Sequence, residues 1–176
     1  RLAVDAVERT REARPDLYRH LLDKTGLQPG ELDDWRSAVE KMHVPFDAKA
    51  NVHLQDDAFL DREVWDFENT PPDKYPLLLH FHPLSIYRHQ VIKQADVVLA
   101  TVLLPHMFSR EERQRIFDYY DPLTTGDSSL SESIQSIAAA EVGEWVAADD
   151  YLTDAVSVDI ADRAGNVRDG MHVASA

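Results

Sequence analysis

The sequence predicts an all-α protein in which helices follow one another through loops, as in toroids of paired helices. Apolar residues recur at intervals of three and four positions over much of the chain, which is the period of one helix face. Pro and Gly stand where these periodic stretches end, as is usual at helix termini. No stretch alternates apolar and polar residues strongly enough to build a sheet, and the sequence has no repeat of fixed length.

The composition is that of a folded, acidic protein. Its 176 residues are 44% hydrophobic, enough for a sizeable core in one domain or one large piece of a domain. The formal net charge of −14 argues against nucleic acid and anionic membranes, because both are bound by clustered basic residues. The lack of Cys excludes disulfides and thiolate metal sites. No apolar run reaches the roughly 20 residues that span a bilayer and no signal peptide opens the chain, so we expect a cytoplasmic protein.

Three helices are predicted at the start of the chain. The apolar period predicts them over residues 1–13, 15–24 and 31–42. Pro15 separates the first two, and Gly26 closes the second. Pro45 ends the third, because the residue before a proline is restricted to extended conformations.

Residues 46–83 have a different character. Pro and Asp recur, aromatic residues cluster, and no helical period persists, which predicts a long ordered loop region. Loops of this length in compact domains are often functional. Aromatic rings and carboxylates suit a sugar, whose C–H faces stack on rings and whose hydroxyls bond to acids. Alternatively, the aromatic residues only pack the loop over the end of the helical fold.

Helices resume in the second half of the chain. They are predicted over residues 85–104, 110–119, 129–141 and 144–159. The breakers Pro105, Pro122 and Gly143 end the first three. Two turns follow, at residues 164–166 and 169–170.

Lys93 and Gln94 are a polar pair at the front of the apolar run 97–104. A helix that is apolar on all sides is surrounded by protein, and a buried ammonium needs an anion beside it. Asp96 lies three positions after Lys93 and could be that partner on a helix. A bound ligand is the equal alternative. The Gln94 amide both donates and accepts hydrogen bonds, which suits a hydroxyl.

The run around Ser128 and Ser129 is a second candidate site. Ser129 and Glu132 have the spacing of a capping box, which predicts a helix that begins there. A helix N-terminus offers free N–H groups and a positive dipole end to an anion. Gly126 would let the backbone approach a ligand closely. The alternative is a capped helix without a ligand.

His172, after the turn at Asp169 and Gly170, is a third candidate. A lone His is more often structural, so its case depends on convergence with the other two sites. Four further histidines do not have a metal-ligand spacing such as H-E-x-x-H, and we expect no metal: His80, His82, His89 and His106.

The motifs at these places resemble the catalytic domain of glycoside hydrolase family 65. The resemblance is carried by Tyr75-Pro76-Leu77-Leu78-Leu79-His80, by Tyr87-Arg88-His89-Gln90-Val91-Ile92-Lys93-Gln94-Ala95-Asp96-Val97, by Phe117-Asp118-Tyr119-Tyr120, by the Asp-Ser-Ser-Leu-Ser run and by the Gly-Met-His-Val-Ala-Ser ending. It covers nearly the whole chain. The family includes inverting phosphorylases for maltose, trehalose and kojibiose, and trehalose hydrolases.

The resemblance implies a fold and a set of site residues. The fold is an (α/α)6 barrel with helices joined by long loops, of which residues 1–176 resemble the C-terminal half as a single fragment. Lys93 and Gln94 would contact a disaccharide substrate. Inorganic phosphate, the co-substrate, would be bound by Ser128, Ser129 and His172, with Gly170 beside them. The family's general acid is a Glu N-terminal to any residue of this chain, so no catalytic acid is assigned here.

Three activities follow as alternatives. Phosphorolysis is the first, because phosphate is already an anion and needs positioning and charge compensation rather than a base. Gly126 and Gln135 stand where the family commonly has His, which leaves room for a hydrolase of the same family. A noncatalytic helical interaction domain is the third. We expect the chain alone to be inactive, and to expose an apolar face that forms homo-oligomers or packs on the missing barrel half.

Overall fold

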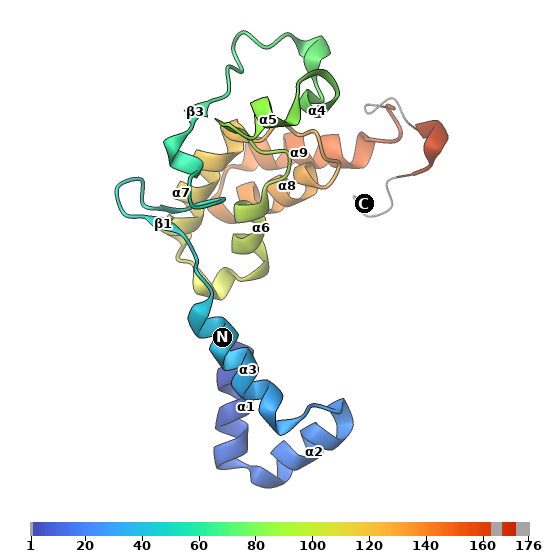
Figure 1. The fold of residues 1–176 in the computed structure, drawn as a ribbon. Coiled ribbons are helices and arrows are strands. Elements are labelled where there is room, and N and C mark those ends of the chain that lie inside the picture. Colours follow the sequence, from blue (N-terminus) through green and yellow to red (C-terminus); the bar gives the residue numbers. More distant parts are fainter. Residues whose placement is uncertain (1, 163–166, 172–176) are drawn as a thin grey trace. The chain divides into compact units, whose positions relative to one another are not determined.

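A computed structural model describes residues 2–162 and 167–171 of the chain. The chain divides into two compact units, which we call unit 1 (Arg1–Val44) and unit 2 (Pro45–Ala176). Figure 1 shows the helices of both units coloured along the sequence.

Unit 1 consists of the three predicted helices, α1 (Leu2–Ala13), α2 (Pro15–Thr25) and α3 (Pro29–Lys41). Gly26 ends α2 with a φ of 70°, a left-handed conformation that glycine adopts without steric cost. The α3 helix begins two residues earlier than predicted. The Glu31 carboxylate accepts a hydrogen bond from the Gln28 backbone N–H over 2.6 Å, which satisfies a donor that the helix start leaves free.

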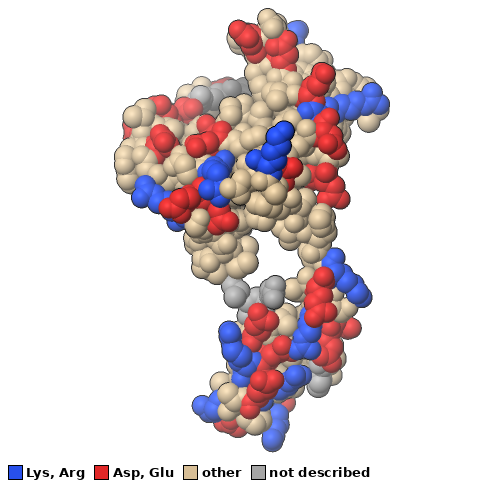
Figure 2. All heavy atoms as spheres, turned by 90° about the vertical axis from the view of Figure 1, so that its left-hand side faces the viewer, with Lys and Arg blue, Asp and Glu red and all other residues tan. Residues whose placement is uncertain are grey.

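The helices of unit 1 bury a small core and carry a mixed charge. Val4, Tyr18 and Leu32 are buried, and Arg36 of α3 forms an ion pair with Glu8 of α1. On the face shown in Figure 2, acidic and basic side chains intermingle over this unit. Residues 1–44 hold eight Lys and Arg against nine Asp and Glu. Almost all of the net charge of −14 therefore lies in unit 2.

Unit 2 begins with short elements joined by turns. They are β1 (Phe46–Asp47), β2 (Val52–His53), η1 (Phe59–Asp61), β3 (Glu63–Val64), η2 (Pro72–Lys74), α4 (Leu77–His80), α5 (Pro83–Ile86) and β4 (His89–Gln90). No alternation in the sequence is strong enough to predict a sheet, but β1 and β2 pair antiparallel and β3 and β4 pair parallel. Each strand has two residues, too few for the alternation that reveals a strand in a sequence.

The aromatic residues of this region pack inside it. Phe59 is buried against Tyr120, with 5.6 Å between the ring centroids. Trp65 meets Phe81 and His89 edge to face, at centroid distances of 5.0 and 5.1 Å. Phe59 therefore packs the start of this region against Tyr120, and the rings around Trp65 hold its later segments together.

Longer helices make up the rest of unit 2. They are α6 (Asp96–Leu103), η3 (Pro105–Met107), α7 (Arg110–Tyr120), η4 (Asp121–Leu123), α8 (Ser131–Val142), α9 (Trp145–Ser157) and η5 (Val167–Asp169). Helix α8 packs on α6, α7 and α9, and Figure 1 shows these four helices grouped within unit 2. Their core includes Val98, Ile116, Phe117, Tyr120 and Ala139. The predicted all-α class is confirmed.

The predicted helix over residues 85–104 is wrong. Residues 83–86 and 96–103 are helical, but β4 lies between them. His89 and Gln90 pair with β3, and Ile92 pairs with Thr124, so backbone groups that a helix would need are bonded elsewhere.

The turn predicted at residues 169–170 is present. Gly170, with a φ of 133°, follows η5, and its N–H donates to the carbonyl of Val167 over 3.1 Å. The turn predicted at 164–166 lies outside the described residues.

Large apolar side chains are exposed on the helices of unit 2. They include Leu103, Met107, Ile137, Trp145, Val146 and Leu152. Helix α6 is therefore not enclosed on every side as predicted: Val98 and Thr101 are buried, but Leu103 is 66% exposed. Among the described residues, no helix has the length and apolar character needed to cross a membrane.

Candidate functional site

Backbone hydrogen bonds join the segment before α6 to the segment before α8. The Ile92 N–H donates to the Leu123 carbonyl, and the Thr125 N–H donates to the Ile92 carbonyl, each over 2.9 Å. Ile92 and Thr124 thereby form a parallel bridge, with Ile92 buried. The bridge fixes Lys93 and Gln94 beside the turn that contains Ser128.

Two side-chain hydrogen bonds extend this bridge. The Ser131 hydroxyl, 1% exposed, donates to the Lys93 carbonyl over 3.1 Å. Gln94 Nε2 donates to Ser128 Oγ over 3.0 Å. The structure therefore brings together three residues that the sequence singled out: Lys93, Gln94 and Ser128.

Lys93 differs from its prediction in position, and one of its two predicted partners, Asp96, is bonded elsewhere. Lys93 precedes α6 instead of lying within it, and its side chain is exposed. Asp96 is the first residue of α6, and its carboxylate accepts from Gln55 Nε2 over 2.9 Å. Across the described part of the chain, Lys93 forms no ion pair. Its ammonium can therefore meet an anion from solution.

The turn before α8 is held differently from the predicted capping box. Helix α8 begins at Ser131, and Leu130 before it has helical backbone angles, so Ser129 does not cap the helix. The Ser128 carbonyl accepts from the Ser131 N–H over 2.9 Å. Gly126 has a φ of 67°, which favours glycine. Ser129 is half-buried beside Ser128 in this turn.

Asp127 anchors the same turn to another element. Its Oδ2 accepts from the backbone N–H of Leu77, the first residue of α4, over 2.9 Å. Leu77 is buried, so this contact fixes the turn to the packed aromatic region. The two residues are 50 positions apart, and local patterns in the sequence cannot reveal the contact.

The third predicted site is described only in part. Gly170 is exposed, after η5. His172 lies outside the described residues. The predicted convergence of His172 with Lys93 and Ser128 stays a prediction.

A hollow of about 600 Å³ lies next to Lys93 and Gln94, and we call it the Lys93 hollow. Two segments line it, one after β2 and the other from the end of α5 to the start of α6. Besides Lys93 and Gln94, its lining includes Gln55, Asp56, Arg62, Tyr87 and Asp96. The hollow has the size of a small-molecule site.

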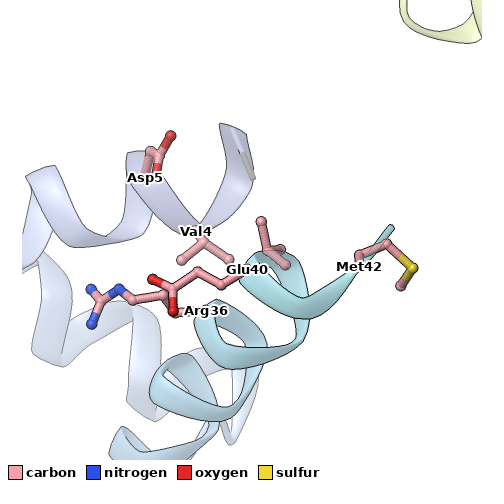
Figure 3. A pocket seen from close by; sticks show the side chains of 6 residues that line it. Val4, Asp5, Arg36, Glu40 and Met42 are labelled. Carbon is pink, nitrogen blue, oxygen red and sulfur yellow. The ribbon is translucent and has the colours of Figure 1, made fainter. Parts of the chain in front are cut away.

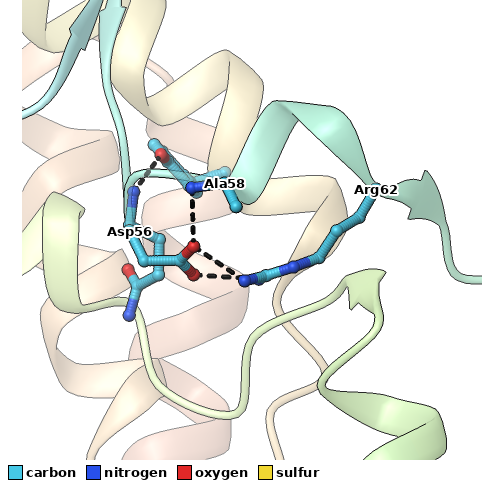
Figure 4. A network of polar contacts seen from close by, with 5 residues as sticks. Asp56, Ala58 and Arg62 are labelled. Atoms are coloured by element: carbon cyan, nitrogen blue, oxygen red, sulfur yellow. Dashed lines mark hydrogen bonds and ion pairs between the residues drawn. The ribbon is translucent and has the colours of Figure 1, made fainter.

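An ion pair in the wall of the Lys93 hollow holds its own loop in place (Figure 4). Both terminal nitrogens of Arg62 donate to the Asp56 carboxylate, over 2.7 and 2.8 Å. Asp56 Oδ1 also accepts from the Ala58 N–H over 3.0 Å. A bidentate pair of this kind fixes the planes of both groups. Sequence reasoning missed the pair, although its spacing of six residues lies within one loop.

Two adjacent tyrosines of α7 also hold this loop in place through hydrogen bonds. The Tyr120 hydroxyl donates to the His53 carbonyl over 2.8 Å and accepts from the Gln55 N–H over 3.0 Å. The Tyr119 hydroxyl donates to Gln90 Oε1, and Gln90 Nε2 donates to the Arg62 carbonyl over 2.6 Å. Burial raises the pKa of both phenols, so they stay protonated and able to donate.

Gln135 occupies a buried position in α8. It is 2% exposed, and its Nε2 donates to Asp121 Oδ1 over 2.8 Å. The Tyr151 hydroxyl donates to the same oxygen over 2.8 Å. Burial, and next the hydrogen bond with Asp121, raise the pKa of Tyr151. The Gln135 amide is thus bonded within the core, in a hydrogen-bonded group with Asp121 and Tyr151.

Unit 1 contains two further hollows, and neither is lined by a predicted site residue. One, of about 500 Å³, is lined by Val4, Arg36 and Met42 among others (Figure 3). The other, of about 440 Å³, is mostly apolar and includes Tyr18 and Trp35. Within residues 2–162 and 167–171, no group of three His, Asp or Glu side chains could hold a metal ion.

Known proteins resemble this chain over its whole length. Residues 1–176 match the family model described as the glycosyl hydrolase family 65 central catalytic domain. The chain is 42% identical over 175 residues to the α,α-trehalose phosphorylase of Geobacillus stearothermophilus, covering 99% of this chain and 23% of that protein. It is 32% identical over 173 residues to the kojibiose phosphorylase of Halothermothrix orenii, covering 98% of this chain and 22% of that protein.

A solved structure has the same fold. It is described as "Putative kojibiose phosphorylase from human microbiome", and the match has a TM-score of 0.76 at 31% identity. It covers 89% of this chain and 21% of the other. The chain thus spans about a fifth of the length of the relatives that it matches. It belongs to glycoside hydrolase family 65, as an all-α part of the central catalytic domain.

Proposed function

We propose that residues 1–176 are the C-terminal half of the catalytic domain of a disaccharide phosphorylase that cleaves an α-glucoside by inverting phosphorolysis. The relatives are phosphorylases for trehalose, kojibiose and maltose, which supports this reaction class. Trehalose is the first substrate to test, because the trehalose phosphorylases share more residues with the chain than the others do.

One observation carries the proposal: Gln94 Nε2 lies 3.0 Å from Ser128 Oγ, and the exposed Lys93 is the adjacent residue. A cation, an amide and a hydroxyl at one place can bind a phosphate oxygen and a sugar hydroxyl together. Unit 2 is strongly acidic, so an anion would be bound only where a local cation outweighs the surrounding charge. Lys93 supplies such a cation.

The proposed roles follow from this geometry and from the family. Lys93 and Gln94 contact the substrate, and Ser128 and Ser129 bind phosphate with Gly170 and His172. The phosphate attacks the anomeric carbon from one face of the sugar. A general acid from another part of the polypeptide protonates the glycosidic oxygen on the other face. The residues in this chain therefore position the phosphate and the sugar and compensate the charge of the phosphate. None of them transfers the proton.

A hydrolase of the same family is the second candidate, and Gln135 favours it. Gln135 stands at a position where the family commonly has His, and its amide is bonded to Asp121 in the core. It therefore adds no donor for phosphate. A hydrolase would instead need a carboxylate that activates water, with the two carboxyl groups about 6.5–9.5 Å apart.

Product analysis separates the two reactions. The full-length polypeptide that contains these residues is incubated with trehalose, with and without inorganic phosphate, and the products are resolved by chromatography. We expect glucose and a glucose phosphate in equal amounts, and only when phosphate is present. Undiminished glucose release without phosphate, with no sugar phosphate formed, would show hydrolysis.

A further inference from the structure

We infer that Asp127 is a positioning residue of the proposed phosphate site, one that holds the site in place without touching the anion. The identity of the anion rests on the proposed function. Asp127 lies in the turn at residues 125–129, which we call the Ser128 turn, between Gly126 and the buried Ser128. Its carboxylate therefore acts on the backbone directly before Ser128 and Ser129, the two serines proposed to bind phosphate.

One anchor of the Ser128 turn lies at its start. The Thr125 N–H donates to the Ile92 carbonyl over 2.9 Å. The Thr125 hydroxyl accepts from the Asp127 N–H over 3.3 Å. These bonds place the start of the turn beside Lys93, but a single anchor leaves the residues after it free to pivot.

The Asp127 side chain supplies a second anchor, on a different element. Its Oδ2 accepts over 2.9 Å from the N–H of Leu77, the first residue of α4. The first N–H groups of a helix have no acceptor within the helix, and Pro76 before it has no polar side chain to cap them. Leu77 is 1% exposed, and a buried donor that loses its acceptor is destabilising. The two anchors together fix Ser128, whose Oγ accepts from Gln94 Nε2 over 3.0 Å.

The charge of Asp127 disfavours direct contact with phosphate. An ionised carboxylate has no hydrogen to donate, and its negative charge repels an anion. A carboxylate beside two phosphate-binding serines would therefore weaken the site if repulsion were its only effect. The hydrogen bond to Leu77 gives it a favourable effect, because that bond holds the serines where Lys93 and Gln94 can share a ligand with them.

The test compares Asp127→Ala with Asp127→Asn in the full-length polypeptide, by titration calorimetry with inorganic phosphate and by steady-state kinetics with trehalose. Asp127→Ala removes the acceptor for the Leu77 N–H. We expect the Kd for phosphate to rise about fivefold or more, and KM for trehalose to change by less than about twofold.

Asp127→Asn separates positioning from charge and from proton transfer. Its amide oxygen can still accept from the Leu77 N–H, but it carries no charge and cannot act as a base. We expect a Kd for phosphate equal to or below that of the wild type, and a kcat within about twofold of it.

Asp66→Ala is the matched control. Asp66 Oδ1 accepts from the Asn69 N–H over 3.2 Å, so this variant also loses a bond from a carboxylate to a backbone N–H. Asp66 is exposed and lies outside the Ser128 turn and the lining of the Lys93 hollow. Its replacement should leave the Kd for phosphate and kcat unchanged.

Four results would overturn the inference. They are a wild type that binds no phosphate, an Asp127→Ala variant that binds phosphate like the wild type, an Asp66→Ala variant with the same loss, and an Asp127→Asn variant that loses phosphate affinity or kcat. If Asp127→Ala does not fold, Asp127→Glu replaces it: the charge stays, the carboxylate moves by one methylene, and the Kd should rise in the same direction. Failure of the proposed function appears elsewhere, as trehalose cleavage without a sugar phosphate while the variants still differ in phosphate binding.

Discussion

At the scale of single residues, Lys93 combines exposure with a fixed backbone. Its carbonyl accepts from the buried Ser131, and its neighbour Ile92 is bridged to Thr124. The side chain itself contributes nothing to the core and extends into solvent. A residue held in this way can be changed without unfolding the protein, so its effect on activity can be read directly.

We expect Lys93→Ala to lower kcat/KM of the full-length polypeptide by roughly 10²-fold or more, because the variant loses a charge that positions substrate or phosphate. Steady-state kinetics with varied phosphate would measure the loss. Lys49→Ala is the control, since Lys49 is an exposed lysine outside the Lys93 hollow. Unchanged turnover of folded Lys93→Ala would favour the noncatalytic interaction domain.

Part of the site could be predicted from the sequence and part could not. The sequence predicts Lys93, Gln94 and Ser128 as site residues because each polar group stands next to an apolar run or a turn, and the structure brings the three together. The hydrogen bond between Gln55 and Asp96 joins residues 41 positions apart, and the spacing of neighbouring residues in the sequence cannot predict it. The same limit applies to the two alternatives for Lys93: Asp96 is near in sequence, but its carboxylate is bonded to the distant Gln55 amide. The ion pair with Asp96 is therefore wrong, and the ligand alternative stays a prediction.

At the scale of the elements, local signals predicted the helices that depend on local contacts. Helices α1, α2 and α7 were predicted within about one residue at their ends, because apolar periods and adjacent Pro or Gly mark them. The helix over 85–104 was predicted wrongly. Its apolar residues are compatible with a helix, but His89 and Gln90 pair with β3, and the backbone of Ile92 is hydrogen-bonded to Leu123 and Thr125. Long-range pairing overrode the local preference.

The break between α8 and α9 gives a test at this scale. Gly143 has a φ of 101°, and a Cβ built there would lie 3.0 Å from Nη2 of Arg110. That nitrogen donates to the Val142 carbonyl over 2.9 Å at the end of α8. We expect Gly143→Ala to lower the free energy of unfolding by about 1–2 kcal/mol, measured by urea denaturation.

Gly30→Ala is the control for this measurement. Gly30 lies in the first turn of α3, has no positive φ, and would place a Cβ in open space. Because Ala favours a helix over Gly, stability should stay the same or rise by up to about 1 kcal/mol. Equal effects of the two substitutions would contradict the role assigned to Gly143.

At the scale of the whole molecule, we expect the isolated 176-residue chain to have no turnover. The proposed reaction needs a general acid, and no residue of this chain is assigned that role. Trehalose and phosphate incubated with the purified chain should give no sugar phosphate above a blank without protein. Measurable turnover would show that the acid lies within residues 1–176.

The same chain should self-associate. Leu103, Trp145, Val146 and other large apolar side chains are exposed on unit 2, and an exposed apolar surface lowers its free energy by association. Sedimentation velocity over a range of concentrations would measure it. A single monomeric species at all concentrations would contradict this prediction.

The bridge between Ile92 and Thr124 has a consequence for how such a site can change during evolution. Its two hydrogen bonds run between main-chain atoms, which every amino acid except proline provides in the same form. The spacing between residues 93–94 and the turn at 126–129 is therefore largely insensitive to which side chains occupy those positions. Mutations can exchange one ligand chemistry for another while the distance across the site is inherited unchanged. Selectivity for a sugar or an anion could thus diverge rapidly on a backbone that does not have to be rebuilt.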